Sequence, residues 1–330
     1  MSPDVDIIVQ YIPGVDPLWA SFFHRTMTHS PLFALIVSPI AGYILSKICK
    51  KRHIPWYVWW IITFISLLSH IFLDRCTTYG VWLLWPFVDV WYEARIMNVI
   101  DVFYTVPLLW FLIWYLIISR KKRSTWTYMR TPWLRFIWVT FAWLYLLIMT
   151  FQQISFKNAM RHDMQQASVW YTDIFAAPQL MQPFLWYGIV NTTEWTYKIN
   201  HSSIFDTKPR TYETIPTWHE LTDSILKDEK VASIFEKLQH RSYGWYQIES
   251  VVWSWWTWTS AWSWYMKGSL MFRDLRFGRM LWWDKQSRGE MVFSYAYDPF
   301  TSSITQYHRH DASTPFAQLW KKHWQRVWWN

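Results

Sequence analysis

Long apolar runs fill the first half of the chain and set the strongest limit on its fold. They cover residues 31–48, 54–73, 98–118 and 133–151. The hydrocarbon core of a bilayer is about 30 Å thick, and a helix of about 20 apolar residues crosses it. Ser30 followed by Pro31 is a typical helix start, with a side-chain cap and a proline in the first position. We therefore predict an α-helical integral membrane domain with about four spans.

The second half of the chain is mostly polar. Its short alternating stretches, such as residues 185–190 and 291–297, predict strands. Residues 219–238 are charged and periodic, and residues 315–328 carry Trp in an amphipathic pattern, so both predict helices. This change of composition predicts a membrane domain over residues 1–151 and an α+β extramembrane domain of unknown role over residues 152–330.

Basic residues predict how the chain is oriented in the membrane. The formal net charge is +9. Many Lys and Arg residues flank the apolar runs, at residues 47–52 and 120–135, as membrane anchoring requires, so we expect no nucleic-acid partner. Loops rich in Lys and Arg stay in the cytoplasm. The second domain is therefore predicted to be extracytoplasmic.

Histidine and aspartate residues gather at the predicted outer ends of the spans. His70 and Asp74 are four residues apart on one helix, so both side chains can approach one ion. Such side chains bind catalytic metals, and ionisable groups at membrane depth are costly unless they are paired. We predict a metal site formed by Asp4, Asp6, His24, His29, His70, Asp74 and Asp101.

A structural role is the alternative for each of these residues. A lone His beside a helix start is more often hydrogen-bonded than bound to metal, and Asp101 in a first turn favours the helix dipole. For the whole chain, the alternative is a non-enzymatic membrane protein with a structural polar cluster and an outer domain that binds an unknown protein partner. Convergence of separate segments on one membrane face favours metal binding. One carboxylate, Asp74 or Asp6, is then available as a general base.

Several motifs in the first half resemble a known family. They are Pro3-Asp4-x-Asp6, His24-Arg25-x-x-Thr28-His29-Ser30, His70-x-x-Leu73-Asp74-x-x-Thr77-x-Tyr79-Gly80, Leu84-Trp85-Pro86-Phe87 and Ile100-Asp101. Together they are similar to the bacterial inner-membrane, metal-dependent hydrolases of the DUF457 type, also called LexA-binding membrane-associated hydrolases. The resemblance is close over residues 3–118. Thr26 stands where that family commonly has Gly, which adopts a positive φ more easily than Thr does.

The resemblance implies a multi-pass protein of the bacterial inner membrane whose Asp and His residues hold a divalent metal ion for hydrolysis. Zinc and manganese are the expected ions, because nitrogen and oxygen ligands suit both. The spacing also resembles zinc-dependent phospholipase C proteins, which implies phosphoesters or lipid-like substrates at the outer membrane face. Membrane lipid and a small-molecule or lipid-like substrate are the expected partners. Members of the family usually carry a further apolar segment before the first motif, whereas this sequence begins at that motif.

Overall fold

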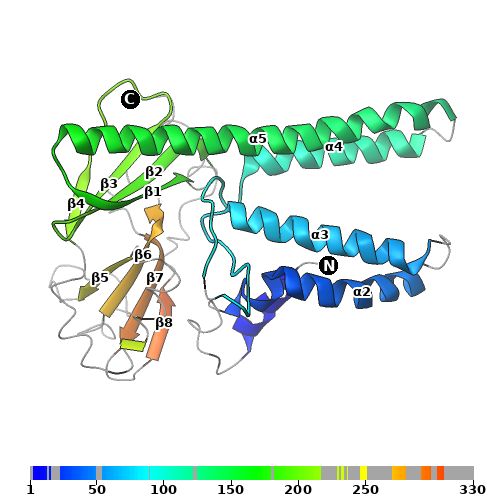
Figure 1. Ribbon diagram of the computed structural model, residues 1–330, viewed down its shortest axis with the longest axis horizontal. Helices are drawn as coiled ribbons and strands as arrows, with labels where there is room; N and C mark the ends of the chain where they lie inside the picture. The colour runs from blue at the N-terminus through cyan, green and yellow to red at the C-terminus, as the bar shows by residue number, and fades with distance from the viewer. Residues whose placement is uncertain are drawn as a thin grey trace, which may run out of the picture. The chain divides into compact units, whose positions relative to one another are not determined.

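The chain forms helices over its first half and two β-sheets over its second half (Figure 1). The structure, a computed structural model, describes residues 3–12, 15, 23–49, 54–88, 90–121, 125–179, 182–216, 229, 232–233, 236, 246–250, 270–279, 291–298 and 303–307. The chain divides into two compact units: Met1–Arg95 with Pro216–Ala312, and Ile96–Ile215 with Ser313–Asn330. Helices followed by strands agree with the predicted membrane part and α+β region.

The first membrane helix, α2 (Pro31–Ile48), begins where the sequence predicts. Ser30 Oγ accepts a hydrogen bond from the backbone N–H of Phe33 at 3.1 Å, and Pro31 takes the first helical position. This cap satisfies one of the N–H groups that a helix start leaves open. The helix therefore starts directly after the segment that carries His29.

The next helix, α3 (Trp56–Cys76), lies side by side with α2 (Figure 1). A Cβ added to Gly42 of α2 would lie 2.5 Å from backbone atoms of Trp60, so only glycine permits this approach. Trp60 Nε1 also donates a hydrogen bond to Ser38 Oγ at 3.1 Å. Nearer the start of α2 and the end of α3, a buried apolar cluster contains Ala34, Leu67, Ile71 and Val81. Close packing thus holds the start of α2 beside the end of α3.

Two further helices, α4 (Val102–Lys121) and α5 (Thr125–Gln166), also lie side by side (Figure 1). Within the described part of the chain, three helices are long and apolar enough to cross a membrane: Pro31–Ile48, Trp56–Cys76 and Phe136–Gln166. The third predicted run forms a shorter apolar helix, Val102–Ile117. Three to four apolar helices therefore stand where about four spans are predicted.

α5 continues without a break through residue 152, where the change of composition places the predicted domain boundary. Its last turns pack on a β-sheet. Gln153 Nε2 donates a hydrogen bond to the carbonyl of Ala176 at 3.0 Å, and the rings of Phe156 and Trp186 lie 5.9 Å apart. One helix therefore serves both the apolar segment and the sheet, while the boundary at residue 152 stays a prediction.

The sheet beside α5 has the strand order β1–β2–β3–β4. The first three strands pair in antiparallel fashion, and the predicted strand at residues 185–190 lies inside β2. The strands are β1 (Tyr171–Gln179), β2 (Gln182–Thr192), β3 (Thr196–Ser203) and β4 (Glu213–Pro216).

The second sheet is antiparallel and has the strand order β5–β6–β7–β8. Its strands are β5 (Tyr246–Ser250), β6 (Leu270–Arg279), β7 (Met291–Asp298) and β8 (Ser303–Tyr307). The predicted strand at residues 291–297 is β7. Of the predicted helix at 219–238, the described residues 229, 232–233 and 236 are helical, and the predicted helix at 315–328 lies outside the described residues.

The close approach of α2 and α3 makes Gly42 a sensitive position. We expect Gly42→Ala to lower the thermal midpoint of the detergent-solubilised protein, because the added methyl group would meet the backbone of Trp60. Overpacking of this kind costs about 1–3 kcal/mol. Ile44→Ala, at an exposed position on the same helix, is the control and should change the midpoint little. Equal thermal midpoints for Gly42→Ala and the parent would show that α2 and α3 can move apart at this position without loss of stability.

The predicted orientation is tested by accessible thiols at two positions of the chain. Glu194 lies in the exposed turn between β2 and β3, and Cys49 ends α2. We expect a membrane-impermeant thiol reagent to label Glu194→Cys in intact spheroplasts and to label Cys49 only after lysis. The reverse pattern would overturn the orientation derived from the Lys and Arg residues.

Candidate metal centre

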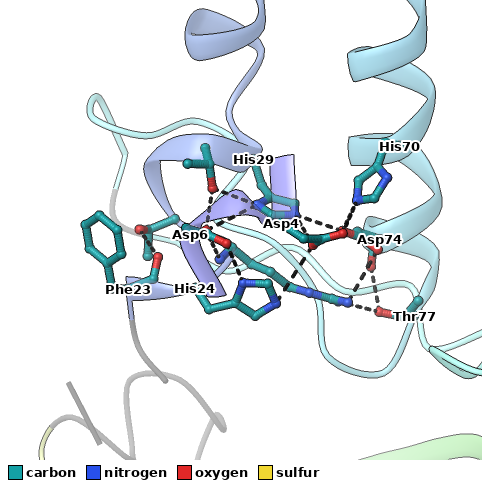
Figure 2. Close-up of polar contacts among 11 residues, drawn as sticks. Asp4, Asp6, Phe23, His24, His29, His70, Asp74 and Thr77 are labelled. Carbon is teal, nitrogen blue, oxygen red and sulfur yellow. Dashed lines mark hydrogen bonds and ion pairs between the residues drawn. The ribbon is translucent and has the colours of Figure 1, made fainter. Parts of the chain in front are cut away.

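Three segments that are distant in the sequence meet at the end of the α2 and α3 pair. The 3₁₀ helix η1 (Pro3–Tyr11) carries two aspartates. The short helix η2 (Met27–His29) carries His29, and the turn before it carries His24. The end of α3 carries His70 and Asp74. Figure 2 shows these side chains pointing toward one another: Asp4, Asp6, His24, His29, His70 and Asp74.

Asp4, His29, His70 and Asp74 form the tightest group, which we call the four-residue group. One potential ligand atom from each lies within 4.8 Å of those of the others. His29 Nε2 lies 3.2 Å from Asp4 Oδ1 and 3.0 Å from Asp74 Oδ2. His70 Nε2 lies 3.2 Å from Asp4 Oδ2. Ligands at 2.0–2.1 Å from a tetrahedral zinc are separated by roughly 3.3 Å, so these distances suit such an ion.

The helical spacing of His70 and Asp74 brings them together as predicted. His70 Nε2 and Asp74 Oδ2 lie 3.3 Å apart at positions i and i+4 of α3. Both atoms are buried, and neither has a hydrogen bond of acceptable geometry, although they are close. Lone pairs that converge on a common point without pointing at each other are what a shared cation requires. The two atoms therefore fit a metal better than they fit a hydrogen-bonded pair.

A hydrogen-bond relay fixes which nitrogen of His29 faces the group. Thr28 Oγ donates its single hydrogen to Asp6 Oδ2, so it accepts at its lone pairs. His29 Nδ1 lies 2.9 Å from Thr28 Oγ and must be the donor of that bond. In the neutral ring, the hydrogen is therefore on Nδ1 and the lone pair is on Nε2. This is the tautomer that a metal-binding histidine needs, held by an outer-shell partner.

The same tautomer leaves the four-residue group short of positive charge. His29 Nε2 lies 3.2 Å from Asp4 Oδ1, a hydrogen-bonding distance, and 3.0 Å from Asp74 Oδ2. It can donate to these oxygens only when the ring carries a second proton, and in the neutral ring all three atoms are acceptors that repel one another. His29 is fully buried, so water cannot screen this contact from its side. A cation between the atoms would turn the repulsion into attraction.

Asp6 lies behind the four-residue group, and both of its oxygens are engaged. Asp6 Oδ1 accepts from His24 Nδ1 at 2.8 Å, and Oδ2 accepts from the backbone N–H of Arg25 at 3.2 Å as well as from Thr28. Burial alone raises the pKa of Asp6, but the bonds from His24 and Thr28 outweigh it and lower the pKa below its usual value. The carboxylate is ionised and fully used, which suits a positioning role.

His24 lies at the edge of the four-residue group. With Nδ1 bonded to ionised Asp6, its Nε2 is left as the acceptor and lies 4.0 Å from Asp4 Oδ1. The ring packs edge-on against His29, with centroids 5.5 Å apart. His24 is therefore oriented toward the group without belonging to it. Its predicted ligand role, like that of Asp6, stays a prediction.

Arg25 is a site residue that the sequence analysis did not single out. Its Nη2 lies 3.4 Å from Asp74 Oδ1, its Nη1 donates to Thr77 Oγ, and its guanidinium lies over the ring of Tyr79. The backbone is left-handed, with φ of 67°, a conformation that costs a non-glycine residue about 1 kcal/mol or more. Nothing in the residue type signals this backbone, because Arg rarely adopts it.

Thr26 does not need the conformation that a glycine would permit. Its φ is −91°, while the positive φ of this turn falls on Arg25. The hydroxyl of Thr26 donates to the carbonyl of Phe23 and closes the turn. The Thr at this position is therefore compatible with the arrangement of the two histidines.

Asp101 belongs to the other compact unit and has its own partners. Its Oδ2 accepts from the hydroxyl of Tyr145 at 2.7 Å, and its Oδ1 accepts from the backbone N–H of Tyr104 at 3.1 Å. Its contacts tie the start of α4 to α5, and its predicted role as a ligand stays a prediction.

A family model described as YdjM inner membrane protein matches residues 1–157 of the chain. Neither a search of curated proteins nor a search of solved structures found a match. The matched segment contains the whole four-residue group and most of the apolar helices. It confirms the inner-membrane class that the resemblance implied, while the DUF457 type, the hydrolytic activity and the outward orientation of the second half stay predictions.

The relay from Asp6 through Thr28 to His29 can be tested at its central hydroxyl. We expect Thr28→Val to weaken zinc binding by about 10 to 100-fold, the usual effect of losing an outer-shell partner, because His29 Nδ1 then loses its acceptor. Thr28→Ser keeps the hydroxyl and should bind zinc like the parent. The measurement is a competition titration of purified protein against a chromophoric chelator. Equal affinities for the Val and Ser variants would contradict the relay.

Proposed function

We propose that the protein is a membrane-bound, metal-dependent hydrolase of the inner membrane whose four-residue group holds one divalent cation. The observation that carries this proposal is that one potential ligand atom from each of Asp4, His29, His70 and Asp74 lies within 4.8 Å of the others, while His70 Nε2 and Asp74 Oδ2 are buried without a hydrogen bond. Two imidazoles and two carboxylates suit zinc and manganese. When bound, such an ion supplies a Lewis acid that activates water and polarises the scissile bond.

The remaining side chains of the site position the ligands. Asp6 and Thr28 orient His29, and Arg25 contacts Asp74 Oδ1, which leaves Oδ2 for the four-residue group. These contacts come from one turn and one helix end, so the ligands are held before any ion binds. Preorganisation of this kind reduces the cost of binding and favours one geometry.

His24 is the residue best placed to move a proton. Asp6 holds its Nδ1, so Nε2 can accept a proton on the Asp4 side of the group. In the proposed hydrolysis, the oxygen of water bonds to the acyl or phosphoryl centre of an ester, and the ester C–O or P–O bond breaks. The proton taken up at His24 Nε2 passes to the leaving oxygen. His24 is proposed in place of Asp6 and Asp74 because the oxygens of both carboxylates already contact other groups of the site, and the predicted base role of these two residues stays a prediction.

The alternative is a non-enzymatic membrane protein in which the same residues form a structural polar cluster. The full set of donors around Asp6 is what a structural role would require. A structural role does not explain why His70 Nε2 and Asp74 Oδ2 are buried without hydrogen bonds, because buried polar atoms in structural clusters are normally paired. This observation favours the metal site.

Metal content of the purified protein is the first test. We expect the parent to retain about one equivalent of zinc or manganese after dialysis, and the His29→Ala, His70→Ala double variant to lose it, because half of the ligands are gone. His162→Ala, which removes an exposed histidine of α5, is the matched control and should retain the ion. Undiminished metal in the double variant would contradict the site.

Turnover then separates the enzyme from the structural alternative. The metal-loaded parent should cleave p-nitrophenyl esters or phosphoesters, lose that activity with a chelator, and regain it when the ion is restored. Metal bound with no turnover of any ester would leave the cluster as a structural metal site and refute the hydrolase.

A further inference from the structure

The four-residue group opens to the surface on the side of Asp4 and His70. The side chain of His29 is 0% exposed and that of Asp74 is 13% exposed, whereas those of Asp4 and His70 are 30% and 33% exposed. Figure 2 shows His70 approaching from α3 and Asp4 from η1, and Asp4 contacts both His29 and His70. A substrate must therefore approach between η1 and the His70 face of α3.

The η1 side of this opening is apolar. Val5 and Ile8 are 64% and 63% exposed. In a 3₁₀ helix, residues at i and i+3 lie in one row, so these two side chains form a stripe beside Asp4. Amphipathic helices lie in the plane of the membrane interface with the apolar face buried about 5–10 Å at the boundary between headgroups and acyl chains, and this stripe suits such a position.

The α3 side of the opening continues into the membrane span. Ser66 lies one turn before His70 on the same face of α3. Ser66 and Ser69 are both exposed. The hydroxyl of Ser69 donates to the carbonyl of Ser66, so its hydrogen is satisfied within the helix. Further along, Ile62 is also exposed. This part of α3 can therefore contact hydrocarbon while the hydroxyl hydrogen of Ser69 stays hydrogen-bonded within the helix.

The depth of the group agrees with a substrate from the bilayer. α3 has 21 residues, which gives a length of about 31 Å, close to the hydrocarbon thickness of about 30 Å. His70 lies six residues before the end of the helix, about 9 Å along its axis. Asp74 lies two residues before the end, about 3 Å along the axis. The group therefore lies within about the last 9 Å of the span, next to the boundary layer that holds the ester bonds of a membrane lipid.

We propose that the substrate is a membrane lipid, which enters sideways from the bilayer with its acyl chains along Val5, Ile8 and the exposed face of α3. The proposal rests on the hydrolase function above and adds the class of substrate. Water adds to the carboxylic or phosphoric ester centre at the base of the headgroup, the ester bond breaks, and the leaving oxygen takes the proton. A water-soluble ester would have to enter this apolar opening without chains to anchor it.

Immersion of η1 is tested without any reaction. A nitroxide on Ile8→Cys, in a Cys49→Ser background, is reconstituted into vesicles of phosphatidylethanolamine, phosphatidylglycerol and cardiolipin. Cys76 is buried and is left in place. We expect collisions with oxygen to exceed collisions with a water-soluble nickel complex, and the reverse for Ile204→Cys, an exposed position after β3. Equal access of the nickel complex to both labels would overturn the proposal and leave the hydrolase function untouched.

Turnover gives the second readout. The zinc-loaded parent should cleave a lipid of the same vesicles, and its kcat/KM for long-chain phosphatidylglycerol should exceed that for the water-soluble dihexanoyl form. Ile8→Ser should lower the long-chain value by about tenfold, as the loss of one buried aliphatic side chain predicts, and lower the dihexanoyl value less, because its short chains contact less of the Val5 and Ile8 stripe. Ile204→Ser should change neither. Cleavage of p-nitrophenyl esters with no cleavage of vesicle lipid would refute the lipid substrate alone, whereas no turnover of either would refute the hydrolase.

Discussion

The buried carboxylate of Asp6 is the interaction on which the arrangement of the site depends. Its side chain is 1% exposed, and an ionised carboxylate at that depth is costly unless donors surround it. The donors come from His24, the backbone of Arg25 and Thr28, all in one turn of the chain. The turn must therefore fold against η1, and the left-handed backbone of Arg25 is what this requires. One buried charge thus orders both histidines of the turn.

The membrane helices supply the other half of the site. Gly42 allows α2 and α3 to approach, so the turn that precedes α2 lies beside the last turns of α3. A helix holds its side chains at fixed spacing, and His70 and Asp74 are therefore presented as a rigid pair. The turn holding His29 closes on this pair, and Arg25 links the two halves by contacting Asp74. The packing of α2 against α3 and the charge contacts at the ends of these helices together hold the site in place.

Regular periodicity explains which features of the site could be predicted from the sequence. The pairing of His70 with Asp74 follows from helical spacing, and the start of α2 follows from Ser30 and Pro31. The different partners of Asp4 and Asp6 could not be predicted, because the sequence alone does not show that this segment is a 3₁₀ helix. In a 3₁₀ helix, successive residues are about 120° apart, so i and i+2 face different directions: Asp4 turns toward His70 and Asp6 toward the turn. The partners of Asp101 in α5 depend on packing between distant helices, which no local pattern encodes.

Charge balance gives the site its affinity for a cation. Asp4, Asp6 and Asp74 carry three negative charges when ionised, and Arg25 carries one positive charge, so neutral histidines leave two negative charges at the end of a membrane helix. A divalent ion cancels them. Protons on His29 and His70 would also cancel them, and they would occupy the Nε2 atoms that a metal needs. Metal and protons therefore compete for the same lone pairs, so metal binding must release protons wherever these nitrogens are protonated. Because low dielectric at membrane depth penalises any uncancelled charge, the site is stable only with one of the two in place.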